Sequence, residues 1–262
     1  MDFATLIGLL LGFGAIVGGA VLEGLHLNAL FQPTAALIVL GGTFGAAFVS
    51  FPMATVLQAF KDLKLLFIGR KTQDVLIDEI CAFAVKARKN GIMSLEQDAQ
   101  NLGDRFLKKA ISLSVDGAEP KDIRELLETD REATEEHAKM SAEFFEAAGG
   151  YAPTIGIIGA VLGLIHVMSN LEDTSKLGAG IAVAFVATIY GLVVANLVCL
   201  PAATKIKHRI KEDMLRKEMI IAGVVGIQNG ENPRFLEDRL RSYLSGASPD
   251  KAGGAAEKEG EK

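Results

Sequence analysis

Residues Tyr151–Leu171, which read YAPTIGIIGAVLGLIHVMSNL, contain no Asp, Glu, Lys or Arg. A helix needs about 20 apolar residues to cross roughly 30 Å of hydrocarbon, so this stretch is long enough to span a membrane. Three more charge-free runs occur, at Phe3–Leu22, Thr34–Met53 and Leu177–Thr204. The sequence therefore predicts an all-α, polytopic membrane protein with four transmembrane helices and a helical cytoplasmic insert.

The remainder of the 262-residue chain is charged, and its composition excludes several functional classes. The formal net charge of −5 argues against a nucleic-acid partner. The four histidines show no metal-ligand spacing, and neither a Walker loop nor a G-x-S-x-G motif occurs. We therefore expect no metal site and no enzymatic activity. Cys81 and Cys199 are expected to be separate, unpaired thiols.

Lys and Arg residues are distributed very unevenly. Of the 27, residues 54–150 hold 14 and residues 202–262 hold 12. Because positive residues stay on the cytoplasmic side, these segments and both termini are predicted to be cytoplasmic. The expected organisation is as follows: a transmembrane hairpin at 1–53, a cytoplasmic helical domain at 54–150, spans 3 and 4 at 151–204, C-terminal helices at 205–244, and a disordered tail at 245–262.

The cytoplasmic insert shows helix signals of its own. Apolar residues recur at helical spacing in Asp74–Asn90, and Asn90-Gly91 supplies a stop. Ser94-Leu95-Glu96-Gln97 matches a capping box, which predicts a helix start. Pro120 is expected to open a long helix that reaches Gly149-Gly150, a predicted hinge. On this interpretation Pro153 stands in the first turn of the third span.

The predicted spans contain no carboxylate. A protein that moves protons or ions usually needs a titratable or coordinating group at membrane depth. The chain therefore either conducts nothing or relies on a carboxylate from a partner helix. Thr188 lies near the middle of its run, and taken alone it is best explained by a hydrogen bond to the carbonyl four residues earlier.

Three motifs resemble the MotA/PomA family, the A subunit of the bacterial flagellar stator. They are Tyr151–Leu164, Ala182–Gly191 with the later Pro201, and Ala87-Arg88-Lys89-Asn90-Gly91 followed by Leu95-Glu96. The resemblance covers almost the whole chain. It implies a multi-pass protein of the bacterial inner membrane, with a MotB-like B subunit that supplies a membrane Asp. It also implies a homo-oligomer, a pentamer around two B subunits.

The resemblance also assigns roles to individual residues. Pro153 and Pro201 match prolines linked to ion coupling, and Thr188 matches a pore threonine that faces the partner's aspartate. Ala160 stands where sodium-driven members carry Thr, which favours the proton as coupling ion with no other cofactor.

Arg88 and Glu96 match a charged pair that meets the rotor's switch protein, a FliG-like partner. Without the resemblance, both would be explained as favourable charges at helix ends. Two other functions remain open at this point. One is an ExbB/TolQ-like proton-driven energy transducer, although that family has one span before its large cytoplasmic loop and this chain has two. The other is a non-conducting membrane scaffold.

The charge asymmetry yields a first prediction. A reporter fused after Gly117 should show cytoplasmic activity, because translocating the segment around it would carry most of the chain's positive residues across the membrane. The measurement compares a reporter active only in the cytoplasm with one active only outside, and the same pair fused after Leu25 should give the opposite result. A periplasmic signal after Gly117 would refute the arrangement.

Overall fold

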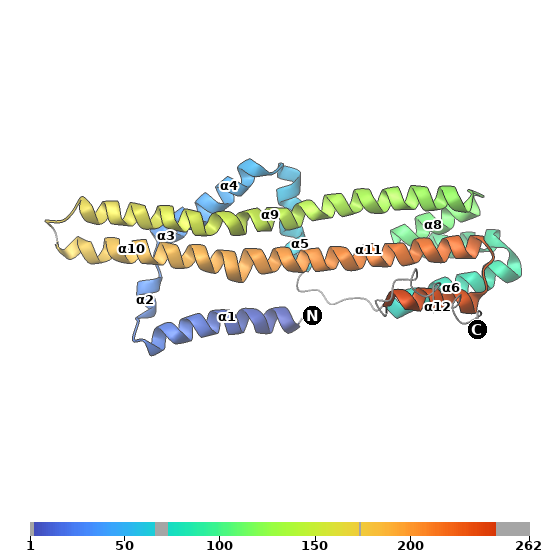
Figure 1. The fold of residues 1–262 in the computed structure, drawn as a ribbon, viewed down its shortest axis with the longest axis horizontal. Helices are drawn as coiled ribbons and strands as arrows, with labels where there is room; N and C mark the ends of the chain where they lie inside the picture. The colour runs from blue at the N-terminus through green and yellow to red at the C-terminus, as the bar shows by residue number, and fades with distance from the viewer. Residues whose placement is uncertain (1–2, 66–72, 173, 245–262) are drawn as a thin grey trace, which may run out of the picture. The chain divides into compact units, whose positions relative to one another are not determined.

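A computed structural model describes residues 3–65, 73–172 and 174–244, and every regular element within these ranges is helical. The α-helices are α1 (Phe3–Leu22), α2 (Leu27–Leu30), α3 (Pro33–Ala36), α4 (Gly42–Ser50), α5 (Met53–Leu65), α6 (Gln73–Asn90), α7 (Glu96–Asn101), α8 (Arg105–Val115), α9 (Pro120–Met168), α10 (Thr174–Val193), α11 (Leu200–Gln228) and α12 (Pro233–Leu244) (Figure 1). Three further segments are η1 (Leu37–Gly41, π), η2 (Ile92–Leu95, 3₁₀) and η3 (Val194–Cys199, π).

Four helical stretches are long and apolar enough to cross a membrane, as the sequence predicted. They are Phe3–Leu22, Leu27–Ser50, part of Pro120–Met168 and part of Leu177–Gln228. The second begins seven residues earlier than expected and is interrupted after Leu30. The last two extend well beyond their charge-free runs, because helical hydrogen bonding continues where the apolar sequence ends.

The chain forms two compact units, each made of two segments. Unit 1 comprises residues 1–69 and 137–209, and unit 2 comprises residues 70–136 and 210–262. The boundaries predicted from charge at residues 53, 150 and 204 separate membrane from cytoplasmic segments, and they stay a prediction. Within unit 1, the rings of six phenylalanines pack together across α4, α5 and α9. They are Phe44, Phe48, Phe51, Phe60, Phe144 and Phe145. The expected tail at 245–262 lies outside the described residues.

Helices α9 and α10 lie side by side and touch through glycine (Figure 1). A Cβ placed on Gly191 would lie 2.5 Å from the backbone oxygen of Ala152, and one on Gly163 would lie 2.8 Å from the nitrogen of Ala184. Distances this short leave no room for a side chain. The small residues thus let the two backbones meet directly, as they do between membrane helices.

The second span is interrupted between α2 and α3, and a hydroxyl from α10 forms hydrogen bonds to backbone groups on both sides of the interruption. Phe31 and Gln32 have extended backbone conformations there, and Pro33 begins α3. The Tyr190 hydroxyl donates a hydrogen bond to the Leu30 carbonyl (2.6 Å) and accepts one from the Gln32 N–H (3.3 Å). Two backbone groups that the broken helix leaves unpaired are thereby satisfied without water.

Unit 2 has its own hydrophobic core, formed by helices α6, α8, α9, α11 and α12. Its largest fully buried side chains include Ile77, Ile80, Leu107, Met219 and Leu236. The predicted helix at Asp74–Asn90 is confirmed as α6 with one additional residue, Gln73.

The capping-box prediction at Ser94 is wrong. Ser94 Oγ donates to the Gly91 carbonyl, and α7 begins at Glu96 with no side-chain cap. The chain turns through the 3₁₀ segment η2 first, so Ser94 does not reach the N-terminal amides. The following helix, α8, does have a side-chain cap: the carboxylate of Asp104 accepts hydrogen bonds from the backbone N–H groups of Phe106 and Leu107.

The hinge expected at Gly149-Gly150 is replaced by uninterrupted helix, and Pro153 lies deep inside α9 instead of in a first turn. Gly149 serves packing, because a Cβ there would lie 2.8 Å from Leu200 Cδ2. The sequence pattern was misread because glycine and proline signal both helix ends and close contacts between membrane helices.

The glycine contact gives a stability prediction. Gly191→Ala should lower the free energy of unfolding by about 1–3 kcal/mol, because its methyl group meets fixed backbone of Ala152 and cannot swing away. The matched control is Gly178→Ala on the same helix, where nothing lies within 4 Å of the added carbon. Thermal denaturation in detergent compares the two. Equal melting temperatures would show that α9 and α10 do not pack this way.

Candidate functional site

Ala160 and Thr188 lie at the same level of the α9–α10 pair. A Cβ on Gly159 would meet the Ala187 methyl at 2.7 Å, and one on Gly156 would lie 3.5 Å from Thr188 Cα. Ala160 directly follows the first glycine and Thr188 directly follows Ala187. Both side chains are partly exposed in the single chain. Two residues that are 28 positions apart in sequence therefore lie at about the same level of the helix pair.

Pro153 and Pro201 lie at different levels. Ala152 is in contact with Gly191, whereas Gly149 is in contact with Leu200. At 1.5 Å per residue, Pro201 is therefore displaced along the helix pair from Pro153 by roughly 10 Å. This offset explains how Ala160 and Thr188 share a level although they lie seven and thirteen residues from their respective prolines.

Pro201 also accounts for a local change of helix type. Proline has no N–H, and its ring crowds the carbonyl four residues earlier, here that of Leu197. The preceding segment η3 (Val194–Cys199) adopts π-helical hydrogen bonding, which accommodates the missing bond without ending the helix. The chain then continues as α11.

The polar side chains near this level bond their own helix. Thr188 Oγ1 donates to the Ala184 carbonyl at 3.3 Å, and Asn196 Nδ2 donates to the Leu192 carbonyl at 2.9 Å. The Thr188 contact is the local bond that the sequence left open as an explanation. It leaves the hydroxyl oxygen's lone pairs available to accept another hydrogen bond.

Arg88 and Glu96 are both exposed, and within the described residues neither forms an ion pair or a side-chain hydrogen bond. Their neighbours do pair: Lys86 Nζ and Asp98 Oδ2 are 2.6 Å apart and link α6 to α7. This bridge ties together the two helices that carry Arg88 and Glu96.

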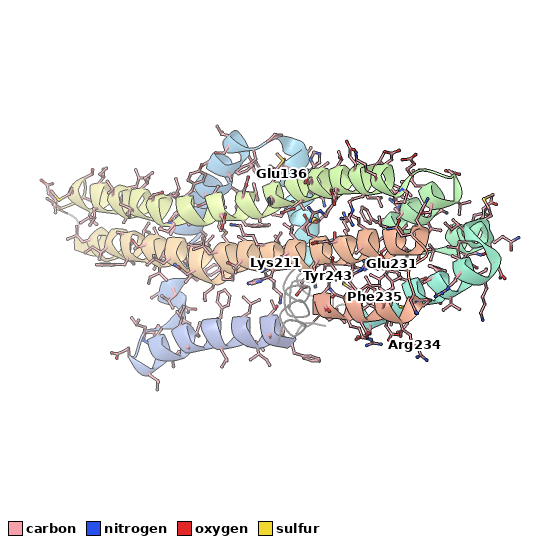
Figure 2. All side chains as sticks on the ribbon, turned by 45° about the vertical axis from the view of Figure 1, so that its right-hand side comes forward. Glu136, Lys211, Glu231, Arg234, Phe235 and Tyr243 are labelled. Atoms are coloured by element: carbon pink, nitrogen blue, oxygen red, sulfur yellow. The ribbon has the colours of Figure 1, made fainter. Side chains whose placement is uncertain are left out.

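Arg88 lines a pocket of about 480 Å³ at which three helices end. Helices α6, α8 and α11 each stop there before a glycine with positive φ: Gly91, Gly117 and Gly230. Glu231, in the turn after α11, also lines it (Figure 2). Helix C-termini carry partial negative charge, so Arg88 is electrostatically favourable there.

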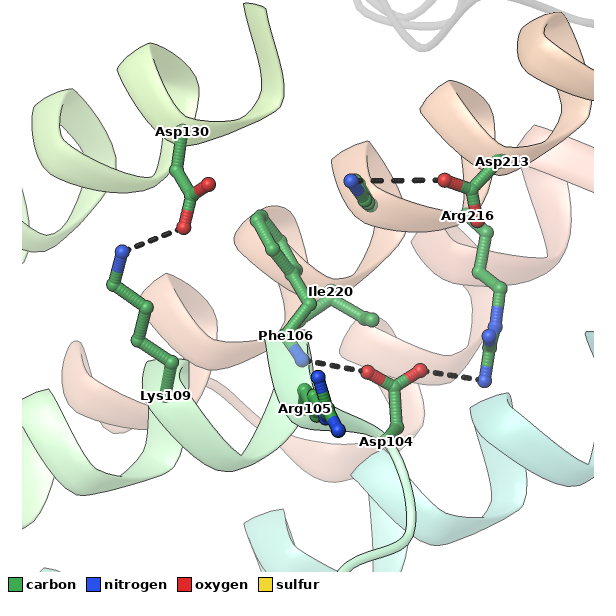
Figure 3. A pocket seen from close by; sticks show the side chains of 9 residues that line it. Asp104, Arg105, Phe106, Lys109, Asp130, Asp213, Arg216 and Ile220 are labelled. Atoms are coloured by element: carbon green, nitrogen blue, oxygen red, sulfur yellow. Dashed lines mark hydrogen bonds and ion pairs between the residues drawn. The ribbon is translucent and has the colours of Figure 1, made fainter. Parts of the chain in front are cut away.

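A second pocket of unit 2, of about 360 Å³, is built by ion pairs (Figure 3). The carboxylate of Asp104 lies 2.7 Å from Arg216, and that of Asp130 lies 2.5 Å from Lys109. Asp213 lies 3.6 Å from Lys217. Every carboxylate that lines this pocket thus has a cation partner. The Lys109–Asp130 and Asp104–Arg216 pairs join α8 to α9 and α11, whereas the Asp213–Lys217 pair lies within α11.

The described residues contain no group of three side chains that could hold a metal ion. Both cysteines are free. Burial, with the nearby carboxylates of Glu237 and Asp78 as further causes, raises the pKa of the Cys81 thiol above its usual range.

Comparison with known proteins agrees with this geometry. Residues 98–219 match the family model described as the MotA/TolQ/ExbB proton channel family, and residues 6–90 match that of the motility protein A N-terminal region. Motility protein A of Bacillus subtilis is 36% identical over 246 residues, which cover 93% of this chain and 91% of that protein. The chain belongs to the MotA/TolQ/ExbB proton channel family.

Solved structures of this family have the same fold. A chain of the C. jejuni MotAB structure matches with a TM-score of 0.89 and 33% identity, over 95% of this chain and 98% of that one. A chain of the flagellar MotAB stator complex from Bacillus subtilis matches with a TM-score of 0.86 and 36% identity, over 93% and 96% respectively.

Tyr190 is a residue whose structural role the sequence did not predict. Its two hydrogen bonds to the interrupted second span were invisible in the sequence, because their partners are backbone groups about 160 residues away. The available signals were a phenol inside an apolar run and a proline, Pro33, near the start of another.

Proposed function

We propose that this chain is the A subunit of a flagellar stator, which forms a proton channel with a MotB-like B subunit and converts ion flow into torque on the rotor. The observation that carries the proposal is the common level of Ala160 and Thr188 in spans that lack any carboxylate. The full-length similarity to motility protein A and to chains of MotAB structures supports it.

The charge-free spans set the mechanism. With no titratable acid at membrane depth in this chain, the coupling carboxylate comes from the partner as a membrane Asp. A periplasmic proton neutralises that Asp and changes its fit against the face that carries Thr188. Each charge that crosses 100 mV releases about 2.3 kcal/mol, which is available for rotation. Pro153 and Pro201 shape the helices on either side of this path.

The assembly we propose is a pentamer of this chain around two B subunits in the bacterial inner membrane. Both termini and unit 2 lie in the cytoplasm, as the lysine and arginine distribution favours. Unit 2 then presents Arg88 and Glu96 to a FliG-like switch protein. The exposure of both side chains, with no partner in the described ranges, leaves them available for such contacts.

An ExbB/TolQ-like transducer is the second candidate, and the shared family model allows it. The motility protein A N-terminal model over residues 6–90, together with the two spans that precede unit 2's first helix, favours the stator. A non-conducting scaffold would show no ion flux, whereas a stator subunit and a transducer would each conduct protons with their partner.

Proton flux tests the function and the coupling ion together. Vesicles that contain this chain with its B subunit should acidify under a proton gradient, and either subunit alone should not. Flux should not depend on sodium, because the Ala160 methyl cannot replace a water on Na⁺ as a threonine hydroxyl does. Vesicles with the B subunit's membrane Asp changed to Asn are the control. Flux that rises with external sodium at fixed pH would refute the proton assignment.

Charge reversal tests the rotor contact. Arg88→Glu and Glu96→Lys should each reduce swimming speed partially, since an exposed ion pair contributes only about 0–1 kcal/mol. The double variant should be slower than either single variant, with membrane level and B-subunit binding unchanged. Lys121→Glu with Asp122→Lys, exposed at the start of α9, is the matched double reversal. If the Arg88/Glu96 double variant swims at wild-type speed, the rotor contact is contradicted, and both residues act only as favourable charges at helix ends.

A further inference from the structure

The Tyr190 hydroxyl is the directional link between α10 and the second span. It donates to the Leu30 carbonyl and accepts from the Gln32 N–H, on the two sides of the break between α2 and α3. Around it, Ala35 and Val39 of the second span pack against Val186 and Ala187 of α10. Aliphatic packing of this kind has little directional preference, whereas a hydrogen bond weakens steeply when its angle changes.

The other helix that contacts α10 is α9, and small residues form much of that contact. Most of the contact between α10 and α9 that involves glycine is between small residues: Gly156, Gly159 and Gly163 face Ala184, Ala187 and Gly191, while the side chains of Val167 and His166 lie against Gly180 at one end of the pair. Residues this small allow close approach but supply no long side chains that interlock. Such an interface fixes the distance between the two helices more strongly than the rotation of α10 about its own axis.

Rotation of α10 decides where Thr188 faces. Successive residues of an α-helix are about 100° apart, so Thr188 and Tyr190 differ by about 200° and project from nearly opposite sides. Tyr190 is held on the side of the second span. Thr188 is thereby directed away from that span, to a partly exposed position at the level of Ala160.

We propose that Tyr190 is a positioning residue that sets the rotation of α10, and through it the direction in which Thr188 faces. Only the consequence for ion passage rests on the proposed function. Removing the hydroxyl leaves the partly buried Leu30 carbonyl and Gln32 N–H without the partner that joins them to α10. These groups then seek other partners, and α10 loses the contact that resists its rotation.

Thiol labelling measures this rotation directly. The full chain, co-expressed with its B subunit, carries Cys81→Ala and Cys199→Ala, and one reporter is added at a time. Thr188→Cys reports the partly exposed side, and Val186→Cys reports the opposite side, which is buried against the second span. Labelling rates with N-ethylmaleimide are compared in membranes with and without Tyr190→Phe, which removes only the hydroxyl.

We expect Tyr190→Phe to cause reciprocal changes of at least threefold: the thiol introduced by Val186→Cys reacts faster, and the one introduced by Thr188→Cys reacts more slowly. The matched control is Tyr151→Phe on α9, which removes a hydroxyl bonded to Ser50 Oγ at 3.0 Å and should leave both rates unchanged. Unchanged rates in Tyr190→Phe overturn the proposal. Rates that rise together, or a variant absent from the membrane, also overturn it, because the hydroxyl then serves general packing or folding.

Proton flux distinguishes the positioning role of Tyr190 from the role of Thr188 in ion passage. Reciprocal labelling with flux reduced at least threefold supports both the positioning role and the function of Thr188 in ion passage. Reciprocal labelling with wild-type flux supports Tyr190 as the positioning residue and contradicts the proposed role of Thr188.

Discussion

Direct contact between the backbones of α9 and α10 is the constraint on which unit 1 depends. Gly156, Gly163 and Gly191 admit the facing backbone at distances that exclude any side chain. Because lipid provides no hydrophobic drive for helix association, such close packing is a main source of stability between spans. It also determines the register that brings Ala160 level with Thr188. The level of the candidate ion path is thus set by where the glycines occur, and the backbone of Thr188 itself lies against Gly156.

The membrane imposes a second condition, that polar groups find partners within the protein. Thr188 and Asn196 meet it by bonding to their own helix. The interrupted second span meets it through Tyr190. The π-helical segment before Pro201 is another local solution. These local bonds satisfy polar groups at irregular segments of the spans, and those of Thr188, Tyr190 and Asn196 lie on or against α10 and the π-helical segment that follows it.

Unit 2 follows the rules of water-soluble helical packing. Its core is aliphatic, and Asp104 both caps α8 and pairs with Arg216. Three helices end at one pocket through positive-φ glycines, which places exposed backbone termini beside Arg88. The C-termini of these helices give this surface partial negative charge. Such a surface suits a contact that forms and breaks repeatedly, since exposed charges bind weakly.

Sequence alone determined the all-helical class, the four spans and the limits of the helix at Asp74–Asn90 to within one residue, because desolvation of charge and helical periodicity act over short stretches. The resemblance pointed to the family, which the comparisons confirmed. Tertiary structure decided what depends on distant partners: the two compact units, the continuous helix through Pro153, and the hydrogen bonds of Tyr190. Glycine and proline carry several meanings in sequence, and only the neighbouring helix selects one of them.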